Sequence, residues 1–312
     1  MKIFITGGTG NIGQYVSLAV VEAGHEAIVL SRSPEKYPSL AKRVQLVQGH
    51  ITDYDLMGEY VQGCDAVIHI ALGWGDEPVS MLTNDTAATV HLLELAERAG
   101  VGKFIYTSST AAMGHMRDGM DETLSNMPLD LYGSTKSASE AFVLGFCKYY
   151  NGGAVSMKRN VIRPGYTYAN PPFPDGSSQS DTRFKDIARA VCTDGEIKVT
   201  KHDGTQFISS PEIARLYLAL LESEKNEEVY LALGNVFTTW EEIARMALAL
   251  RPDSRARLVV EDKGWDAQPK LYDVGKMERN FGLSFDSQAD LADHVRWNVE
   301  MAGDSSTELQ AE

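Results

Sequence analysis

A tyrosine and a lysine four residues apart have the types and spacing to exchange a proton with a bound molecule. The segment Leu131–Lys136 reads LYGSTK and is predicted to open a helix capped by Asp130, which places Tyr132 and Lys136 on one helix face. An unperturbed tyrosine titrates near ~10, whereas a neighbouring ammonium favours the phenolate and makes proton exchange with an alcohol or carbonyl feasible. The same spacing fits a surface pair on an amphipathic helix, so the surrounding elements must decide.

A glycine-rich turn near the N-terminus has the pattern of a phosphate cradle. Residues 3–13 read IFITGGTGNIG, which predicts a strand, a turn and the start of a helix. Gly7 permits the tight turn, Gly10 lets the backbone approach a pyrophosphate, and Gly13 lets the helix pack close to the sheet. The N–H groups at the helix start attract phosphates, and the preceding strand is the context that a dinucleotide site requires.

The end of the second expected strand bears on which dinucleotide binds. Sites that prefer NAD usually hold a carboxylate there for the ribose 2′-OH, whereas a 2′-phosphate needs a cation. This chain reads Val29–Ser33 as VLSRS and has no carboxylate before Glu35. Arg32 can bind the phosphate as a forked donor, assisted by the hydroxyl of Ser31 or Ser33. We therefore expect NADP, with NAD as the alternative if Arg32 only lies in solvent or stacks on adenine.

Composition and charge exclude several classes of protein. The 312 residues are 43% hydrophobic and 23% charged with a net charge of −14, which disfavours nucleic acid and anionic membranes as partners. No apolar run reaches the ~18 residues of a membrane span, and the N-terminus does not resemble a signal peptide. The scattered His and Cys residues form no metal-binding motif. We expect a cytoplasmic protein with no metal.

Short apolar strands alternate with helical segments over the first 165 residues. Helix-period stretches such as Ile12–Ala23 and Thr89–Ala99 lie between the strands. This alternation predicts a doubly wound α/β fold with a parallel sheet covered on both faces. The expected strands are Lys2–Ile5, Ala27–Leu30, Val44–Val47, Ala66–Ile70, Phe104–Thr107 and Val155–Ile162.

The composition changes after Arg163, which suggests a second part. Tyr166–Asp181 is rich in proline and without periodicity, as functional loops often are. We expect a dinucleotide-binding domain at 1–165, with 206–234 returning to it. A smaller, mostly helical substrate-binding part would comprise 166–205 and 235–302, and 303–312 would be a flexible tail. The expected later elements are helices at Asp181–Val191, Pro211–Leu221, Thr239–Leu250, Asp273–Phe281 and Ser287–Met301 and a strand at Val229–Leu233.

Taken together, these motifs resemble one family. A strand that runs into hydroxyl residues, Phe104–Thr110, ends where ligands of open α/β sheets bind. The chain is similar to extended short-chain dehydrogenases/reductases with a Rossmann domain, the NAD(P)-dependent epimerase/dehydratase superfamily. The matching segments are Thr6–Gly13 (TGxxGxxG), Asp65–Ala71, Tyr106–Ser109, Tyr132–Lys136 (YxxxK), Asn160–Gly165 and Glu212–Ala214.

The resemblance implies a role for each matching residue. Tyr132 would be the general acid/base, Lys136 would hold the nicotinamide ribose and lower the pKa of Tyr132, and Ser109 would bind the substrate oxygen. Tyr166 would join Ser109 in contacting substrate. The implied cofactor-binding residues are Gly7, Gly10, Asn11, Ile12, Gly13, Ser31, Arg32, Ile51, Ala71, Thr107, Lys136 and Pro164.

Three positions depart from the family pattern. His50 replaces the usual carboxylate that reads the adenine amine, and Asp85 stands where an Asn opens an Asn-x-x-Gly-Thr run. The segment before Phe207 lacks the Arg by which nucleotide-sugar enzymes grip a diphosphate. Dehydratases also carry an acidic pair after the catalytic hydroxyl, where this chain has Thr110 and Ala111.

These observations leave three functions open. The first is an NAD(P)-dependent dehydrogenase or reductase of a small hydroxy or carbonyl compound, such as a sugar or sugar acid. The second is a nucleotide-sugar epimerase that recycles its bound NAD, which the missing Arg and the net charge of −14 disfavour. The third, a non-catalytic dinucleotide sensor, would not need Ser109, Tyr132 and Lys136 together.

The helices beside the expected catalytic strand carry more apolar residues than one core stripe needs. Helices at Thr89–Ala99 and Leu131–Tyr149 would therefore bury a second face. Relatives that this chain resembles often pair these helices across a two-fold axis, so we expect a homodimer, unless the helical part of the same chain covers that face. The residues concerned are Leu92, Leu95, Ala138, Ala141, Phe142, Leu144, Gly145 and Phe146.

Overall fold

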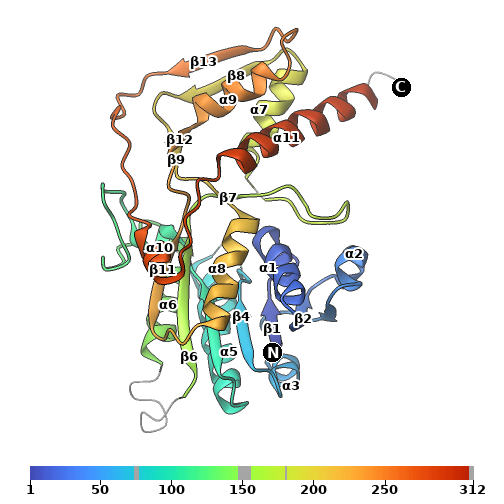
Figure 1. Cartoon of the computed structure of the whole chain (residues 1–312), viewed down its shortest axis with the longest axis vertical. Coiled ribbons are helices and arrows are strands. Elements are labelled where there is room, and N and C mark those ends of the chain that lie inside the picture. The colour runs from blue at the N-terminus through green and yellow to red at the C-terminus, as the bar shows by residue number, and fades with distance from the viewer. Residues whose placement is uncertain (74–76, 147–155, 180, 309–312) are drawn as a thin grey trace.

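A seven-stranded parallel sheet forms the centre of the molecule. The structure, a computed structural model, describes residues 1–73, 77–146, 156–179 and 181–308 (Figure 1). The strand order β11-β6-β5-β4-β1-β2-β3 confirms the predicted doubly wound α/β fold. The strands are β1 (Lys2–Thr6), β2 (Glu26–Ser31), β3 (Gln45–Gln48), β4 (Ala66–His69), β5 (Lys103–Thr107), β6 (Lys158–Pro164) and β11 (Glu228–Ala232). Strand β6 begins later than expected, and Val155 lies outside the described residues.

Helices cover both faces of the sheet because successive strand residues point to opposite sides. On one face, α1 (Asn11–Glu22) and α8 (Ser210–Glu222) lie side by side and bury Ile3 and Ile5 of β1 (Figure 1). On the other face, Phe4 belongs to a core that three helices cover. These helices are α3 (Tyr54–Val61), α5 (Ala88–Arg98) and α6 (Leu131–Gly145). Segment α10 (Gly275–Phe281) packs beside β11.

A second core lies beyond the carboxyl ends of the strands (Figure 1). It contains α7 (Arg183–Cys192), α9 (Trp240–Ala249) and α11 (Gln288–Glu308). Strands β8 (Glu196–Thr200) and β13 (Arg257–Glu261), which the sequence analysis did not anticipate, form a separate parallel pair. Helix α11 continues to Glu308, beyond the expected end at Met301, and the flexibility expected of 303–312 stays a prediction.

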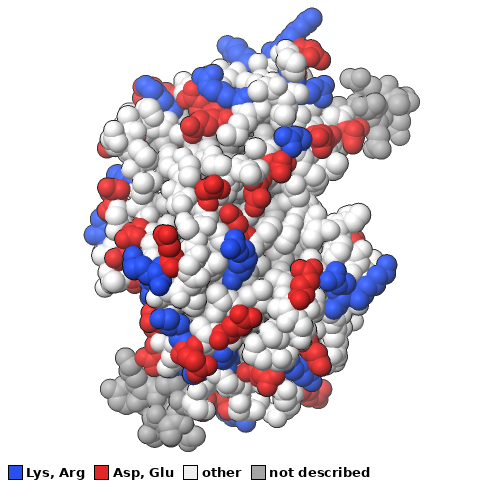
Figure 2. All heavy atoms as spheres, viewed as in Figure 1, with Lys and Arg blue, Asp and Glu red and all other residues white. Residues whose placement is uncertain are grey.

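Short segments connect the two parts. Strand β7 (Thr167–Tyr168) pairs with β10 (Ile208–Ser209), and β9 (Gly204–Thr205) pairs with β12 (Thr238–Thr239). On the face shown in Figure 2, acidic and basic side chains are interspersed. No helix of the described residues is long and apolar enough to cross a membrane.

A buried ion pair attaches α6 to the sheet. Arg163 at the end of β6 donates from Nε and Nη2 to the two carboxylate oxygens of Glu140 on α6, at 2.9 and 2.7 Å. Both side chains are almost fully buried, and Asn126 donates a further bond to Glu140. The paired geometry compensates the cost of taking both charges out of water. It fixes the helix that carries Tyr132 and Lys136.

We expect Glu140→Ala to lower the free energy of unfolding by about 3–5 kcal/mol, because it leaves the Arg163 guanidinium buried without a counter-charge. The matched control is Glu94→Ala, which breaks an exposed pair with Arg98 and should cost about 0–1 kcal/mol. Urea denaturation followed by circular dichroism measures both. Equal losses in the two variants would show that the buried pair does not anchor α6.

Candidate active site

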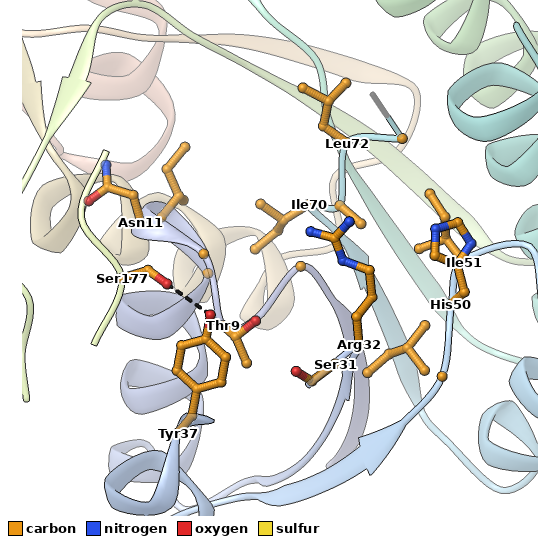
Figure 3. Close-up of a pocket in the computed structure, with 18 of the residues that line it drawn as sticks. Thr9, Asn11, Ser31, Arg32, Tyr37, His50, Ile51, Ile70, Leu72 and Ser177 are labelled. Carbon is orange, nitrogen blue, oxygen red and sulfur yellow. Dashed lines mark hydrogen bonds between the residues drawn. The ribbon is translucent and has the colours of Figure 1, made fainter. Parts of the chain in front are cut away.

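The larger cavity of the site lies where the strand order reverses, between β1 and β4. It has a volume of about 580 Å³ and opens at the carboxyl ends of the strands (Figure 3). One wall is the glycine-rich turn, and the others come from β2, from the loop after β3 and from the loop after β4. The expected cofactor-binding residues that line it are Gly7, Gly10, Asn11, Ile12, Gly13, Ser31, Arg32, Ile51 and Ala71.

The geometry of the turn explains two of its glycines. Gly7 has φ +70°, and a Cβ on it would lie 2.5 Å from the Ala71 backbone nitrogen. A Cβ on Gly13 would lie 2.0 Å from the Gly7 carbonyl oxygen. Gly10, the N-cap of α1, provides no side-chain cap, which leaves the first helical N–H groups without a side-chain acceptor. This backbone cradle fits the pyrophosphate of a dinucleotide.

Polar side chains stand at the far end of the same cavity. Arg32 is exposed and extends along the cavity wall beside Ser31, whose hydroxyl accepts a bond from the Ser33 backbone N–H (Figure 3). His50, in the loop after β3, also lines the cavity, and its Nδ1 lies 2.9 Å from the Thr52 hydroxyl. A guanidinium beside a hydroxyl can bind either a ribose or a 2′-phosphate.

The irregular stretch after β7 reaches across the rim of this cavity. Gln14 on α1 donates to the Ser177 carbonyl at 2.6 Å and accepts from its N–H at 3.1 Å. The Tyr37 hydroxyl lies 3.2 Å from the Ser177 hydroxyl, as Figure 3 shows, and the Ser39 N–H donates to Asp175. These bonds place Ser177 in the cavity wall. Sequence analysis missed Ser177 and Tyr37 because no local pattern links them to the glycine turn.

The expected catalytic residues meet in a smaller adjoining cavity. Ser109, Tyr132 and Lys136 line it, together with Thr107 and Pro164. The two cavities share wall residues, so they are neighbouring parts of one site. The shared residues are Ile12, Ile70, Leu72 and Thr167. The structure thus brings together the hydroxyl at the end of β5 and the YxxxK motif of α6.

Local capping fixes these side chains. Asp130 accepts a bond from the Gly133 N–H at 2.7 Å, as predicted for the N-cap of α6. Ser109 caps the short helix η3 (Thr110–Met113) by accepting from the Ala111 N–H. Its hydroxyl also bonds the Tyr132 phenol, and this bond acts to lower the Tyr132 pKa.

The charge beside Tyr132 differs from the expectation. Lys136 Nζ lies 3.3 Å from Asp85 Oδ1, and both side chains are buried. Burial raises the pKa of Tyr132 above 10.0, and the Asp85 and Asp130 carboxylates raise it further, against the Ser109 hydrogen bond. The net direction is therefore opposite to the lowering expected from Lys136, whose ammonium contacts a carboxylate. Burial lowers the pKa of Lys136, which Asp85 counteracts.

A buried hydrogen-bond chain supports this ion pair. His69 of β4 bonds the hydroxyl of Thr6 through Nδ1 at 2.6 Å and that of Thr89 through Nε2 at 3.0 Å. Thr89 in turn donates to the Asp85 carbonyl at 2.8 Å. Burial, and secondly the Lys136 charge, lower the pKa of His69 to about 3, so the ring is neutral. No sequence pattern predicts this set of hydrogen bonds, apart from a histidine at the end of a strand.

The substrate role of Tyr166 stays a prediction. The structure places its ring among Phe207 and Trp240, outside the linings of both cavities, and its hydroxyl accepts a bond from Gln179. Within the described residues, no group of three His, Cys, Asp or Glu side chains could hold a metal ion.

Comparisons with known proteins place this geometry in a family. The model of the NAD dependent epimerase/dehydratase family matches residues 3–232. A dTDP-glucose 4,6-dehydratase of Mycolicibacterium smegmatis is 31% identical over 247 residues, which cover 72% of this chain and 74% of that protein. A 3 beta-hydroxysteroid dehydrogenase/Delta 5→4-isomerase of Mycobacterium tuberculosis is 31% identical over 211 residues, covering 64% of this chain and 53% of the relative. The chain thus spans about half the length of the steroid enzyme.

Solved structures share the fold over nearly the whole chain. The UDP-glucuronic acid 4-epimerase of Bacillus cereus, solved with UDP-glucuronic acid and NAD, superposes with a TM-score of 0.78 at 20% identity. The match covers 97% of this chain and 99% of that one. The dTDP-glucose 4,6-dehydratase of Streptomyces venezuelae, solved with NAD, gives a TM-score of 0.77 at 22% identity, covering 96% and 97%.

Proposed function

Because the chain belongs to the NAD dependent epimerase/dehydratase family, we propose that it is an NAD(P)-dependent oxidoreductase of a small hydroxy or carbonyl compound, with sugars and sugar acids as candidates. The observation that carries the proposal is the meeting of Ser109, Tyr132 and Lys136 in a cavity that adjoins the glycine-rich cradle. A protein that only senses a dinucleotide would have no use for this cluster.

The chain's own residues supply binding and proton transfer. A bound nicotinamide dinucleotide accepts or supplies the hydride. The α1 N-terminus and the Gly7–Gly13 turn would hold its pyrophosphate, and Lys136 would bind the nicotinamide ribose. Tyr132 would give or take a proton at its phenolic oxygen while the Ser109 hydroxyl bonds the reacting substrate oxygen.

A nucleotide-sugar epimerase is the second candidate, favoured by the structural match with the Bacillus cereus enzyme over nearly the whole chain. Two features of this chain weigh against it. Thr205 and Gln206 precede Phe207 where an Arg would grip a diphosphate, and the net charge is −14. The absorbance spectrum of the purified protein separates the candidates, because an epimerase that recycles its cofactor would retain it through purification.

We expect Tyr132→Phe to lower turnover about 100- to 10,000-fold, because the variant lacks the proton that Tyr132 transfers. Dinucleotide binding, measured by calorimetry, should change little. Tyr54→Phe is the matched control, since Tyr54 stacks on His91 and lines neither cavity. Turnover is followed at 340 nm with a panel of hydroxy and carbonyl compounds. A Tyr132→Phe variant that keeps more than about a tenth of wild-type turnover would remove Tyr132 from the acid/base role.

We propose that the cofactor is NADP. It rests on Arg32, which is exposed at the wall of the larger cavity, and on the absence of a carboxylate between Leu30 and Glu35. Relatives solved with NAD, such as the Bacillus cereus epimerase, make NAD the alternative.

We expect Arg32→Asp to shift the ratio of NADP to NAD affinity towards NAD by about tenfold or more, because a charge-assisted hydrogen bond contributes about 1.5–3 kcal/mol. The introduced carboxylate would also accept from the ribose 2′-OH. Arg43→Asp changes the net charge equally but lies outside the cavity, and it should leave the ratio unchanged. An unaltered ratio in Arg32→Asp would exclude Arg32 from the site.

We propose that the protein forms a homodimer. Phe142 on α6 is 51% exposed and Leu82 is 52% exposed, and the segments that carry them pack together. Val79 on α4 (Pro78–Met81) extends this apolar face. Leu92, by contrast, is fully buried in the core of the chain, so the apolar face that its helix offers to a partner is smaller than predicted.

Light scattering at micromolar concentration should give a mass near twice the 34.2 kDa of one chain. Phe142→Glu should shift the mass towards the monomer by burying a charge in the interface. Trp265→Glu is the control, because Trp265 is equally exposed at 51% but lies elsewhere on the chain. A monomeric wild-type protein would contradict the dimer.

A further inference from the structure

The site contains a fully buried carboxylate, that of Asp85, to which the proposed reaction assigns no role. It lies on η2 (Leu82–Ala87), a single π-helical segment before α5, with no exposed side-chain surface. Asp85 Oδ1 lies 3.3 Å from Lys136 Nζ, and Oδ2 has no hydrogen-bond partner within the described residues. Lys136 is therefore the main compensation for a fully buried negative charge.

The position of this pair determines the charge that Tyr132 experiences. Lys136 Nζ lies over the Tyr132 ring, 6.0 Å from its centre, and 3.3 Å from Asp85 Oδ1. An isolated ammonium at that distance would stabilise the phenolate. Because Asp85 contacts Lys136, the Tyr132 phenol faces an ion pair with no net charge. The ammonium then stabilises the Tyr132 phenolate less than an unpaired ammonium would.

Other titratable groups around the pair do not replace the missing cation. Glu140, one turn further along α6, is bound by Arg163, and Asp130 caps the same helix. His69 of β4 faces Lys136 but is neutral, because burial lowers its pKa to about 3. Tyr106 of β5, whose ring centre lies 5.2 Å from Lys136 Nζ, is buried with a raised pKa.

We propose that Asp85 is a positioning residue that holds the Lys136 ammonium in an ion pair, so that the Tyr132 phenol keeps its proton at neutral pH. The inference rests on the proposed function, since it assigns to Tyr132 the role of proton donor in its resting form. The phenolic O–H bond then breaks only as the proton passes to the substrate oxygen. The hydrogen bonds that link Thr6, His69 and Thr89 end at the Asp85 carbonyl and hold the Asp85 backbone in place.

The test follows the Tyr132 phenol directly, without substrate or dinucleotide. Protein labelled with ¹³C at the ζ carbon of tyrosine is titrated with base by NMR, and Tyr132→Phe identifies the resonance. In the wild type, the Tyr132 resonance should show no transition near neutral pH, because burial raises the pKa of the phenol. A wild-type transition near neutral pH would overturn the proposal.

Asp85→Asn should lower the Tyr132 pKa by about one unit or more, because Lys136 then acts on the phenol uncompensated. The matched control Glu94→Gln removes an exposed carboxylate elsewhere on the same helical stretch and should leave the transition where it is. A Tyr132 transition that does not move in Asp85→Asn would overturn the proposal.

A second variant keeps the test decisive if Asp85→Asn does not fold. Asp85→Asn combined with Lys136→Met removes both charges and leaves no buried charge unpaired. Its Tyr132 pKa should lie within about half a unit of the wild-type value, because a neutral pair has been replaced by neutral groups. A rise of about one unit or more would mean that Lys136 acted on Tyr132 despite Asp85, which contradicts the proposal.

Kinetics separate this inference from the proposed function. If Tyr132 is the proton donor, the high-pH limit of carbonyl reduction should move with the NMR transition in Asp85→Asn. An NMR shift without any matching change in the pH profile would leave the Asp85 inference intact and would remove Tyr132 from the acid role.

Discussion

The close contact between the first turn and the start of α1 is the constraint on which the site depends. Gly13 must approach the Gly7 carbonyl, and Gly7 must approach Ala71, so side chains are excluded at both glycines. This contact joins β1, α1 and the loop after β4 at the point where the strand order reverses. The larger cavity forms where these three segments meet, and the glycine-rich turn and the start of α1 line it.

Charge is handled differently at the two ends of the site. In the larger cavity Arg32 is exposed, and its guanidinium is accessible to an anionic ligand. In the smaller cavity Lys136 is buried and paired with Asp85, and Tyr132 beside it is half-buried. By the proposed function, the first cation would bind a ligand, whereas the second, paired with a carboxylate, would affect the proton affinity of Tyr132.

The sequence predicted the repetitive features of the fold and the short-range motifs. Apolar strands and the TGxxGxxG and YxxxK spacings lie within single elements, so the sheet and the meeting of Ser109, Tyr132 and Lys136 followed from them. The contacts of Ser177 with Gln14 and Tyr37 and the pair Asp85–Lys136 join residues far apart in the sequence, and no local pattern specifies such contacts. Asp85 was noticed as a departure, but its consequence for Tyr132 required the distance to Lys136.

By the proposed function, the two adjoining cavities form one dinucleotide site with Tyr132 at its reacting end. A crystal structure of the protein soaked with NAD would locate the dinucleotide relative to Tyr132. We expect the pyrophosphate at the N-terminus of α1 and the nicotinamide ribose within hydrogen-bond distance of Tyr132 or Lys136. A dinucleotide bound elsewhere, or one whose nicotinamide points away from Tyr132, would contradict the account.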